Sequence, residues 1–247
     1  MMLKRTVIKL SGEAIGNTSG TGYNDVVIDS IVSQVCTVVQ AGTEVALVIG
    51  GGNLWRGIQA RPDMDRVKAD QMGMLATVMN AIYLAEAFKR YKQKAVVMTP
   101  IPFGNITVQY NNDNALEYLA KGTVIINAAG LGHPMFSTDT ITALRAAELE
   151  ADCILYAKNV DGVYDKDPKR VVDAKKYKTL NYQTAVSQSL NAADMAAMHL
   201  SHESGIPSFV FKLDEENSII KACAYPDTGS LEGTYISCDI KEDFYAS

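Results

Sequence analysis

The sequence predicts an α/β protein: a three-layer αβα sandwich with a mainly parallel sheet. Short apolar runs of strand length alternate along the chain with stretches in which apolar residues recur at helical spacing. Strands separated by helices favour right-handed crossovers, which make successive strands parallel and place helices on both faces of the sheet. Several of the apolar runs also lead directly into glycine-rich turns. The balance of 47% hydrophobic and 21% charged residues is that of an ordinary globular protein.

The predicted elements follow one another in a regular order. Thr6 to Leu10 is expected to be a short strand, and apolar residues from Ile28 to Val39 have helical spacing, with Gly42 ending that helix. Glu44 to Ile49 is a continuous apolar run typical of a strand buried on both faces, and a long helix follows from about Met72 to Tyr83. Further strands are predicted at Ala95 to Met98, Ile106 to Tyr110, Thr123 to Ala128, Cys153 to Tyr156 and Ser208 to Phe211.

The chain shows no sign of division into parts. It contains no Pro/Ser-rich linker, break in composition or internal repeat, so residues 1–247 are expected to form a single domain. The stretch from Asn159 to Asn181 is charged, contains Pro168 and has weak periodicity. We expect it to be a surface excursion beside the sheet.

Composition also narrows the partners. Lys and Arg total 23 against 28 Asp and Glu, a formal net charge of −5, so no nucleic-acid partner is expected and any anionic ligand must be held by a local site. No segment approaches about 18 uninterrupted apolar residues and no signal-peptide core is present, so no membrane association is expected and we expect a cytoplasmic protein. The four cysteines form no CxxC pair and are expected to be buried reduced thiols.

Ligands of open parallel sheets bind at the carboxyl ends of the strands. Lys9 ends the first strand, where an ammonium group can meet a phosphate, although a snorkelling lysine would have the same pattern. The turn from Gly50 to Gly52 follows the second strand and lets the backbone approach a ligand closely, while Arg56 adds a planar fork suited to phosphate oxygens. The spacing matches neither GxGxxG nor GxxxxGK followed by Ser or Thr, which weakens an NAD-binding hypothesis.

A third polar turn precedes a helical pattern. Ser137, Thr138 and Asp139 can cap that helix, whose N-terminal N–H groups then form an anion site. His133 has no second histidine or cysteine at ligand spacing, so substrate contact or a surface position is favoured over catalysis or zinc binding.

The other carboxylates that stand out each have a structural interpretation, and Asp70 has a functional one beside it. Arg66 and Asp70 are one helical turn apart, so they are either an intrahelical ion pair or, for Asp70, an acceptor for ribose hydroxyls at the edge of a buried face. Asp161 and Asp167 precede Gly and Pro, which is turn chemistry first. Asp194 is placed to cap a helix.

Taken together and in this order, these segments resemble the amino acid kinase superfamily, and most closely its bacterial uridylate (UMP) kinase branch. The first two motifs are shared broadly by the superfamily, whereas the run after Asp70 is far more specific to UMP kinases. The matching motifs span nearly the whole chain and are KLSGEA (9–14), GGGNLWRG (50–57), MGMLATVMNA (72–81), FSTDT (136–140) and VDGVY (160–164).

The resemblance implies a nucleoside monophosphate kinase that converts ATP and UMP into ADP and UDP in pyrimidine nucleotide biosynthesis. Mg²⁺ would be carried with ATP, and no metal site of the protein's own is implied. Lys9 would neutralise the transferred phosphoryl group, and Arg56 would stabilise charge between the donor and acceptor phosphates. Asp139 and Asp194 match family positions that orient cationic groups near the reaction centre.

Two nucleotide sites are implied by the same resemblance. ATP would contact Lys9, Leu10, Ser11, Gly12, Gly52, Arg56, either Lys158 or Asn159, Tyr164 and Asp167. UMP would be held by Gly51, by Asp70 on its ribose, and by the loop residues Leu131, Gly132, His133, Pro134, Met135, Phe136, Ser137 and Thr138. This loop departs from the family pattern at His133 and Met135, where side chains that contact the base can differ.

UMP kinases of this branch are homohexamers inhibited by UTP and activated by GTP, so the resemblance implies the same here. The apolar helix from Met72 to Ala87 is a candidate subunit surface, although burial in the core explains the same pattern. The alternatives are a carboxylate or carbamate kinase of the superfamily, which the Asp70 segment argues against, and a non-catalytic anion-binding or storage protein on the same fold. Retention of Lys9, Arg56, Asp139 and Asp194 favours catalysis.

Overall fold

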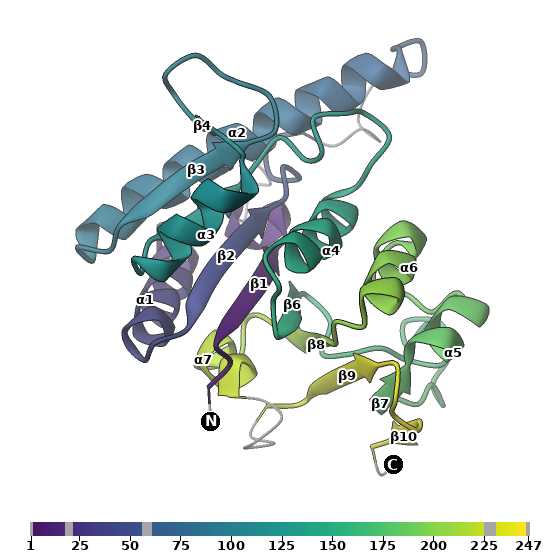
Figure 1. Cartoon of the computed structure of the whole chain (residues 1–247). Helices are drawn as coiled ribbons and strands as arrows, with labels where there is room; N and C mark the ends of the chain where they lie inside the picture. Colours follow the sequence, from purple (N-terminus) through teal and green to yellow (C-terminus); the bar gives the residue numbers. More distant parts are fainter. Residues whose placement is uncertain (1, 18–21, 56–60, 225–230, 246–247) are drawn as a thin grey trace.

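A computed structural model describes residues 2–17, 22–55, 61–224 and 231–245. Its strands form one ten-stranded sheet in the order β10-β7-β9-β8-β6-β1-β2-β5-β3-β4 (Figure 1). The strands are β1 (Arg5–Leu10), β2 (Glu44–Ile49), β3 (Ala95–Thr99), β4 (Val108–Gln109), β5 (Val124–Asn127), β6 (Cys153–Lys158), β7 (Tyr177–Asn181), β8 (Ser208–Lys212), β9 (Gly233–Ser237) and β10 (Asp243–Phe244). The helices are the short 3-10 helix η1 (Gly12–Ile15), α1 (Asp25–Gln40), α2 (Arg66–Arg90), α3 (Asn112–Ala120), α4 (Thr138–Glu148), α5 (Tyr182–Ser187), α6 (Met195–Ser204) and α7 (Ser218–Ala224).

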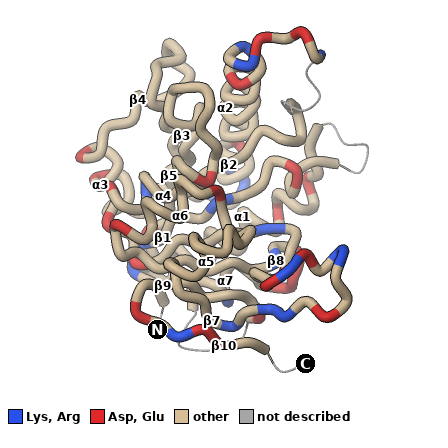
Figure 2. Tube along the Cα trace, turned by 90° about the vertical axis from the view of Figure 1, so that its right-hand side faces the viewer, with Lys and Arg blue, Asp and Glu red and all other residues tan. Residues whose placement is uncertain are grey.

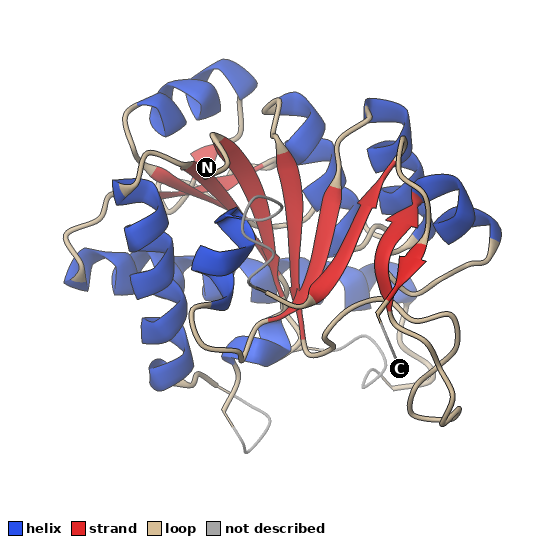
Figure 3. Cartoon of the chain, turned by 90° about the horizontal axis from the view of Figure 1, so that it is seen from below, coloured by secondary structure: helices blue, strands red, loops and turns tan. Residues whose placement is uncertain are grey.

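Helices cover both faces of the sheet, which confirms the predicted three layers (Figure 3). Neighbouring residues of a strand point to opposite faces. Accordingly, Ile8 and Leu10 of β1 pack in a core with α1, α2 and α7. Val7 of the same strand packs in a second core with α3, α4, α5 and α6. β2 is buried on both faces, as its continuous apolar run predicts, and the apolar residues of β1 are buried on both faces as well.

Parallel pairing brings the ends of the central strands to one edge. Leu10 of β1 is in register with Ile49 of β2 on one side and with Ala157 of β6 on the other. β2 pairs in parallel with β5, and β6 with β8. The turns that follow β1, β2, β5 and β6 therefore lie beside one another, although they are far apart in the sequence.

The prediction that Asn159 to Asn181 forms a surface excursion beside the sheet is wrong for its last five residues. Tyr177–Asn181 is strand β7, which pairs in parallel with β9 and antiparallel with β10. β9 also pairs antiparallel with β8, so this side of the sheet is mixed while the rest is parallel. The fourth predicted strand is shorter than expected, because only Val108 and Gln109 pair with β3.

Surface features agree with the composition. Acidic and basic residues alternate along the outer loops and helices, and the strands are mostly uncharged (Figure 2). Cys36, Cys153 and Cys223 are buried free thiols as expected, whereas Cys238 is only partly buried. Within the described ranges, no helix is long and apolar enough to cross a membrane.

Candidate active site

Two lysines from adjacent strands face one carboxylate at the carboxyl edge of the sheet. Lys9 is near the end of β1, Lys158 is the last residue of β6, and Asp139 is in the first turn of α4. The ammonium nitrogen of Lys9 lies 2.9 Å from Oδ1 of Asp139, and that of Lys158 lies 3.8 Å from Oδ2. All three side chains are less than one-fifth exposed. The arrangement concentrates positive charge in a place sheltered from water, where it interacts strongly with an anion.

The sequence left either Lys158 or Asn159 as the residue that contacts ATP, and Lys158 is the more buried of the two. Its ammonium group donates to the carbonyl of Ala192. Burial lowers the pKa of Lys158 and the nearby Lys9 adds to this, while Asp139 acts in the opposite direction. Asn159 instead lines a separate cavity of about 480 Å³ beside α1 and the start of α7. The geometry therefore brings Lys158, and not Asn159, to Asp139.

Asp194 holds two helices together beside this cluster. Its Oδ1 accepts from the backbone N–H of Ala197 at 2.8 Å, which confirms its predicted role as the cap of α6. Its Oδ2 accepts from the hydroxyls of Ser137 and Thr140 at the start of α4. Burial alone would raise the pKa of Asp194, but these hydrogen bonds hold it below its usual value. Asp194 also acts electrostatically on Lys158, so its charge contributes to the field of the cluster.

Ser137 is the residue that caps α4. Its side chain accepts from the backbone N–H groups of Asp139 and Thr140. Thr138 and Asp139 belong to the helix itself, so the predicted capping role is confirmed for Ser137 alone. Because Ser137 occupies two N–H groups of the first turn, the positive character of this region comes mainly from the two lysines.

The glycine turn after β2 packs backbone to backbone against the turn after β1. The N–H of Gly50 donates to the carbonyl of Leu10 at 3.0 Å. A Cβ on Gly12 would lie 2.5 Å from the oxygen of Gly50 and 2.6 Å from the nitrogen of Gly52, so no larger residue fits there. Gly51 meets α2 in the same way, with a Cβ only 2.9 Å from that of Ala76. The glycines therefore permit close packing of these segments. Arg56 lies outside the described residues.

Asn53 and Asn80 support this turn, and sequence analysis assigned neither a role. Their side-chain amides are buried and donate reciprocally, at 2.7 and 3.2 Å, and Asn80 also donates to the carbonyl of Gly50 at 2.7 Å. The pair fixes the glycine turn against α2. The sequence did contain a signal for this pair: Asn80 is a single amide in an otherwise apolar helical run. A polar side chain buried in such a run needs hydrogen-bond partners.

A cavity of about 360 Å³ opens between the glycine turn, α2 and the loop after β5. The predicted acceptor-site residues that line it are Gly51, Asp70, His133, Pro134, Phe136, Ser137 and Thr138. Trp55 and Thr77 also contribute to the lining, and sequence analysis did not single out either of them. Its polar groups and open mouth suit a small ligand rather than a macromolecule.

Asp70 joins α2 to the loop after β5. Its carboxylate pairs with Arg66 at 3.1 Å and accepts from the backbone N–H of Met135 at 2.9 Å. The intrahelical pair is therefore confirmed, and the same carboxylate also faces the cavity. Met135 has a φ of 76° and a mostly exposed side chain, which does not line the cavity. Leu131 and Gly132 are likewise not part of its lining, Leu131 packing on the core instead.

A second cavity, of about 420 Å³, lies between the loop after β6 and the segment that follows α5. Tyr164 and Asp167, which were predicted to contact the donor nucleotide, line it together with Leu190 and Asn191. Asn191 precedes Ala192, whose carbonyl accepts from Lys158. Ser137 and Thr138 line the first cavity and precede Asp139. The lining of each cavity is therefore next in sequence to a residue that belongs to the Lys9–Asp139–Lys158 cluster or contacts it.

No group of three or more His, Cys, Asp or Glu side chains that suits a metal ion occurs in the part of the chain that the structure describes. Asp139 faces two ammonium groups, which compete with a cation for its oxygens. A divalent ion at this edge would therefore take most of its ligands from phosphate oxygens and water, as Mg²⁺ commonly does.

Comparison with known proteins adds to this geometry. The Amino acid kinase family model matches residues 4–212. UMP kinase from Bacillus anthracis is 35% identical over the whole of both chains, with a TM-score of 0.93. UMP kinase from Ureaplasma parvum is 34% identical, with a TM-score of 0.89, and uridylate kinase from Archaeoglobus fulgidus is 28% identical, with a TM-score of 0.72. In both of the latter, 96% of this chain and all of the other are covered.

Proposed function

Because this chain belongs to the amino acid kinase family, we propose that it is a UMP kinase, which transfers the γ-phosphoryl group of ATP to UMP and forms ADP and UDP. The observation that carries the proposal is the pair Lys9 and Lys158 facing Asp139 at the carboxyl edge of the sheet. The similarity to UMP kinases along the full chain supports the choice of acceptor. The proposed place in metabolism is pyrimidine nucleotide biosynthesis.

Phosphoryl transfer leaves little covalent chemistry to the protein, so positioning and charge neutralisation dominate. We assign Lys9 to the transferred phosphoryl group and Lys158 to the phosphates of the donor, with Asp139 holding both ammonium groups in place. Asp194 holds the start of α4, and thereby Asp139, in position. No general base is required, because the attacking oxygen of UMP phosphate is already ionised.

The turns supply the remaining contacts in this proposal. Backbone N–H groups of Gly12 and Gly52 donate to the phosphoryl group. Leu10 and Ser11 contact the phosphates of ATP at the end of β1. Arg56 stabilises charge between the donor and acceptor phosphates. These roles explain why the two turns must pack closely enough for their backbones to reach one ligand.

We propose that Mg²⁺ arrives with ATP. When bound, the ion neutralises phosphate charge, and the donor set described above fits an ion held chiefly on the nucleotide. The residues of the chain then orient the nucleotides and exclude water.

The acceptor is assigned from the first cavity. Asp70 faces it with a carboxylate that can accept from ribose hydroxyls, and Gly51 also lines it. A small carboxylate acceptor has no ribose hydroxyls to donate to Asp70. The test is release of ADP measured with UMP, CMP, dTMP and small carboxylates in turn. Turnover confined to UMP is expected. Turnover with a carboxylate alone would overturn the choice of acceptor, and absence of turnover with every acceptor would favour a non-catalytic binding protein.

A homohexamer is the proposed assembly, with α2 as a subunit contact. One face of α2 is buried in the core, and the opposite face exposes Met72, Leu75, Met79 and Ile82, which are between 40% and 55% accessible. A row of exposed apolar residues at helical spacing is typical of a contact surface. We further propose inhibition by UTP and activation by GTP, as in similar enzymes. The unpaired cysteines support a reducing compartment, which we propose to be the cytoplasm.

A further inference from the structure

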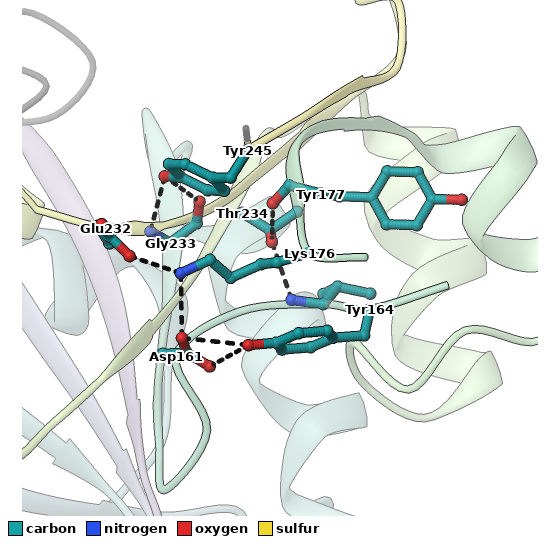
Figure 4. Close-up of polar contacts among 9 residues, drawn as sticks. Asp161, Tyr164, Lys176, Tyr177, Glu232, Gly233, Thr234 and Tyr245 are labelled. Atoms are coloured by element: carbon teal, nitrogen blue, oxygen red, sulfur yellow. Dashed lines mark hydrogen bonds and ion pairs between the residues drawn. The ribbon is translucent and has the colours of Figure 1, made fainter. Parts of the chain in front are cut away.

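We propose that Lys176 is a positioning residue for ATP, because it holds the loop that carries Tyr164 and Asp167 against the C-terminal strands. The inference rests on the proposed function, since it assigns the second cavity to ATP. That loop, residues 160–167, is called the donor loop below. Figure 4 shows Lys176 between the donor loop and the segment that leads into β9.

The ammonium group of Lys176 is held from three sides. Its nitrogen lies 3.0 Å from Oδ2 of Asp161 in the donor loop and 2.6 Å from Oε2 of Glu232, which precedes β9. It also lies 4.5 Å from the ring centroid of Tyr245. The lysine side chain is only 10% exposed. Burial alone would lower its pKa, but the two carboxylates raise it, so Lys176 stays protonated at physiological pH.

Asp161 connects this lysine to the donor cavity. The hydroxyl of Tyr164 donates to the same carboxylate, at 3.0 Å from Oδ1 and 3.2 Å from Oδ2. Burial tends to raise the pKa of Asp161, but Lys176 and Tyr164 together hold it below its usual value. Tyr164 lines the donor cavity, so the ring that contacts ATP depends on a carboxylate whose charge Lys176 balances.

Backbone contacts hold the donor loop to the same strands. The N–H of Val163 donates to Oγ1 of Thr234 at 2.8 Å, and Thr234 donates to the carbonyl of Tyr177 at 2.6 Å. The N–H of Tyr177 in turn donates to the carbonyl of Val163 at 2.8 Å. These bonds do not involve the Lys176 side chain, so we expect them to keep the loop folded when Lys176 is altered. Loss of the ammonium group should therefore displace Tyr164 within a folded protein, and the effect should be specific to the donor nucleotide.

The test replaces Lys176 with Met, which keeps most of its apolar stem and removes the charge. We expect the KM for ATP to rise about tenfold, while the KM for UMP and kcat change little. Lys176→Arg, which restores a cation, should recover most of the loss. Lys178→Met on exposed β7 surface is the matched control and should match the unaltered protein. Calorimetry without UMP measures the affinity for ATP directly and should show the same weakening in Lys176→Met. The outcome then does not depend on the identity of the acceptor.

If Lys176 had only a structural role, Lys176→Met would lower the melting temperature without a selective rise in the KM for ATP. Glu232→Gln removes one of the two charges that hold the same ammonium group but leaves the Asp161 pair intact, so it should raise the KM for ATP less than Lys176→Met does. If Lys176→Met does not fold, Asp161→Asn serves instead, and it should also raise the KM for ATP selectively. Unchanged affinity for ATP, or equal rises in KM for both nucleotides, would overturn the proposal.

Discussion

The ammonium nitrogen of Lys9 lies 2.9 Å from Oδ1 of Asp139, a pair that joins the central strand of the sheet to the first turn of α4. Because Lys158 approaches the other oxygen of the same carboxylate, Asp139 sets the distance between two cations. Because the net charge of the chain is −5, the proposed binding of polyphosphates would depend on this local cluster.

Replacing Lys9 by Ala should depress kcat by several orders of magnitude, because a charge aimed at the transferred phosphoryl group is lost. Binding of both nucleotides should survive, since other contacts hold them. Single-turnover kinetics and equilibrium binding separate the two effects. Lys4→Ala, an exposed change just before β1, is the control. An equal loss of binding and turnover would contradict the assignment.

Asp70→Asn should raise the KM for UMP much more than the KM for ATP. The amide keeps the shape of the carboxylate but loses its charge and part of its capacity to accept from ribose hydroxyls and from the N–H of Met135. Steady-state kinetics with each nucleotide varied in turn measure the ratio. Asp113→Asn, at an exposed position in α3, should leave both constants unchanged. Equal effects on the two nucleotides would argue against a role in the acceptor site.

The fall of activity at alkaline pH should follow the loss of the proton from Lys158. Burial lowers its pKa from the ordinary lysine value of 10.5, so the lysine loses its proton at a lower pH than an exposed lysine does. Only the protonated form attracts phosphate, so activity should be full below this pKa and fall as the pH rises through it. In Lys158→Arg the guanidinium stays protonated, and the alkaline fall in kcat should move upward. Identical alkaline limbs in the two proteins would show that another group controls it.

Asn80→Ala should destabilise the protein by about 1–3 kcal/mol, because the buried carbonyl of Gly50 and the side-chain oxygen of Asn53 lose the Asn80 amide that donates to both. Denaturant unfolding measures the change. Activity should fall as well, since the glycine turn loses its support from α2. Asn114→Ala, at an exposed position in α3, provides the comparison. Full stability in Asn80→Ala would mean that water replaces the lost hydrogen bonds.

Met79→Glu should reduce the size of the assembly, because it places a charge in the centre of the exposed apolar face of α2. Light scattering after size-exclusion chromatography gives the mass directly. Val172→Glu, at a fully exposed apolar residue elsewhere, should not alter it. An unchanged mass in Met79→Glu would place the subunit contact on another surface.

Much of the fold was predictable because its central strands are long apolar runs that end in distinct turns. β1, β2, β3, β5, β6 and β8 all lie where the runs predict them, within one or two residues at each end. β7 escaped prediction because its buried residues, Tyr177 and Leu180, are three apart and break the alternation of a strand. In β9, Gly233 is required by its approach to Phe209 across the sheet, where a Cβ would lie 2.5 Å from the ring. No pattern in the sequence around Gly233 predicts this contact.

The site shows the same division. The polar side chains that meet at the sheet edge were visible in the sequence as polar residues at the ends of predicted strands or at the starts of predicted helices. The choice between Lys158 and Asn159 was not, because β6 is apolar on both faces and has no alternation that indicates which neighbour points inward. Lys176 likewise has other lysines close to it in the sequence, so nothing local distinguishes it. Only the fold brings Asp161 and Glu232 to its ammonium group.

The sequence by itself determined the order of the helices and strands from β1 to β6, together with β8, and the residue types at the ends of these strands, because periodicity and turn composition are local properties. Tertiary structure alone decided which of these groups meet. Lys9, Asp139 and Lys158 converge because β1 and β6 are parallel neighbours in register and α4 packs across their ends. The same pairing of distant segments places Lys176 against the donor loop, and long-range contacts of this kind leave no mark in any short stretch of chain.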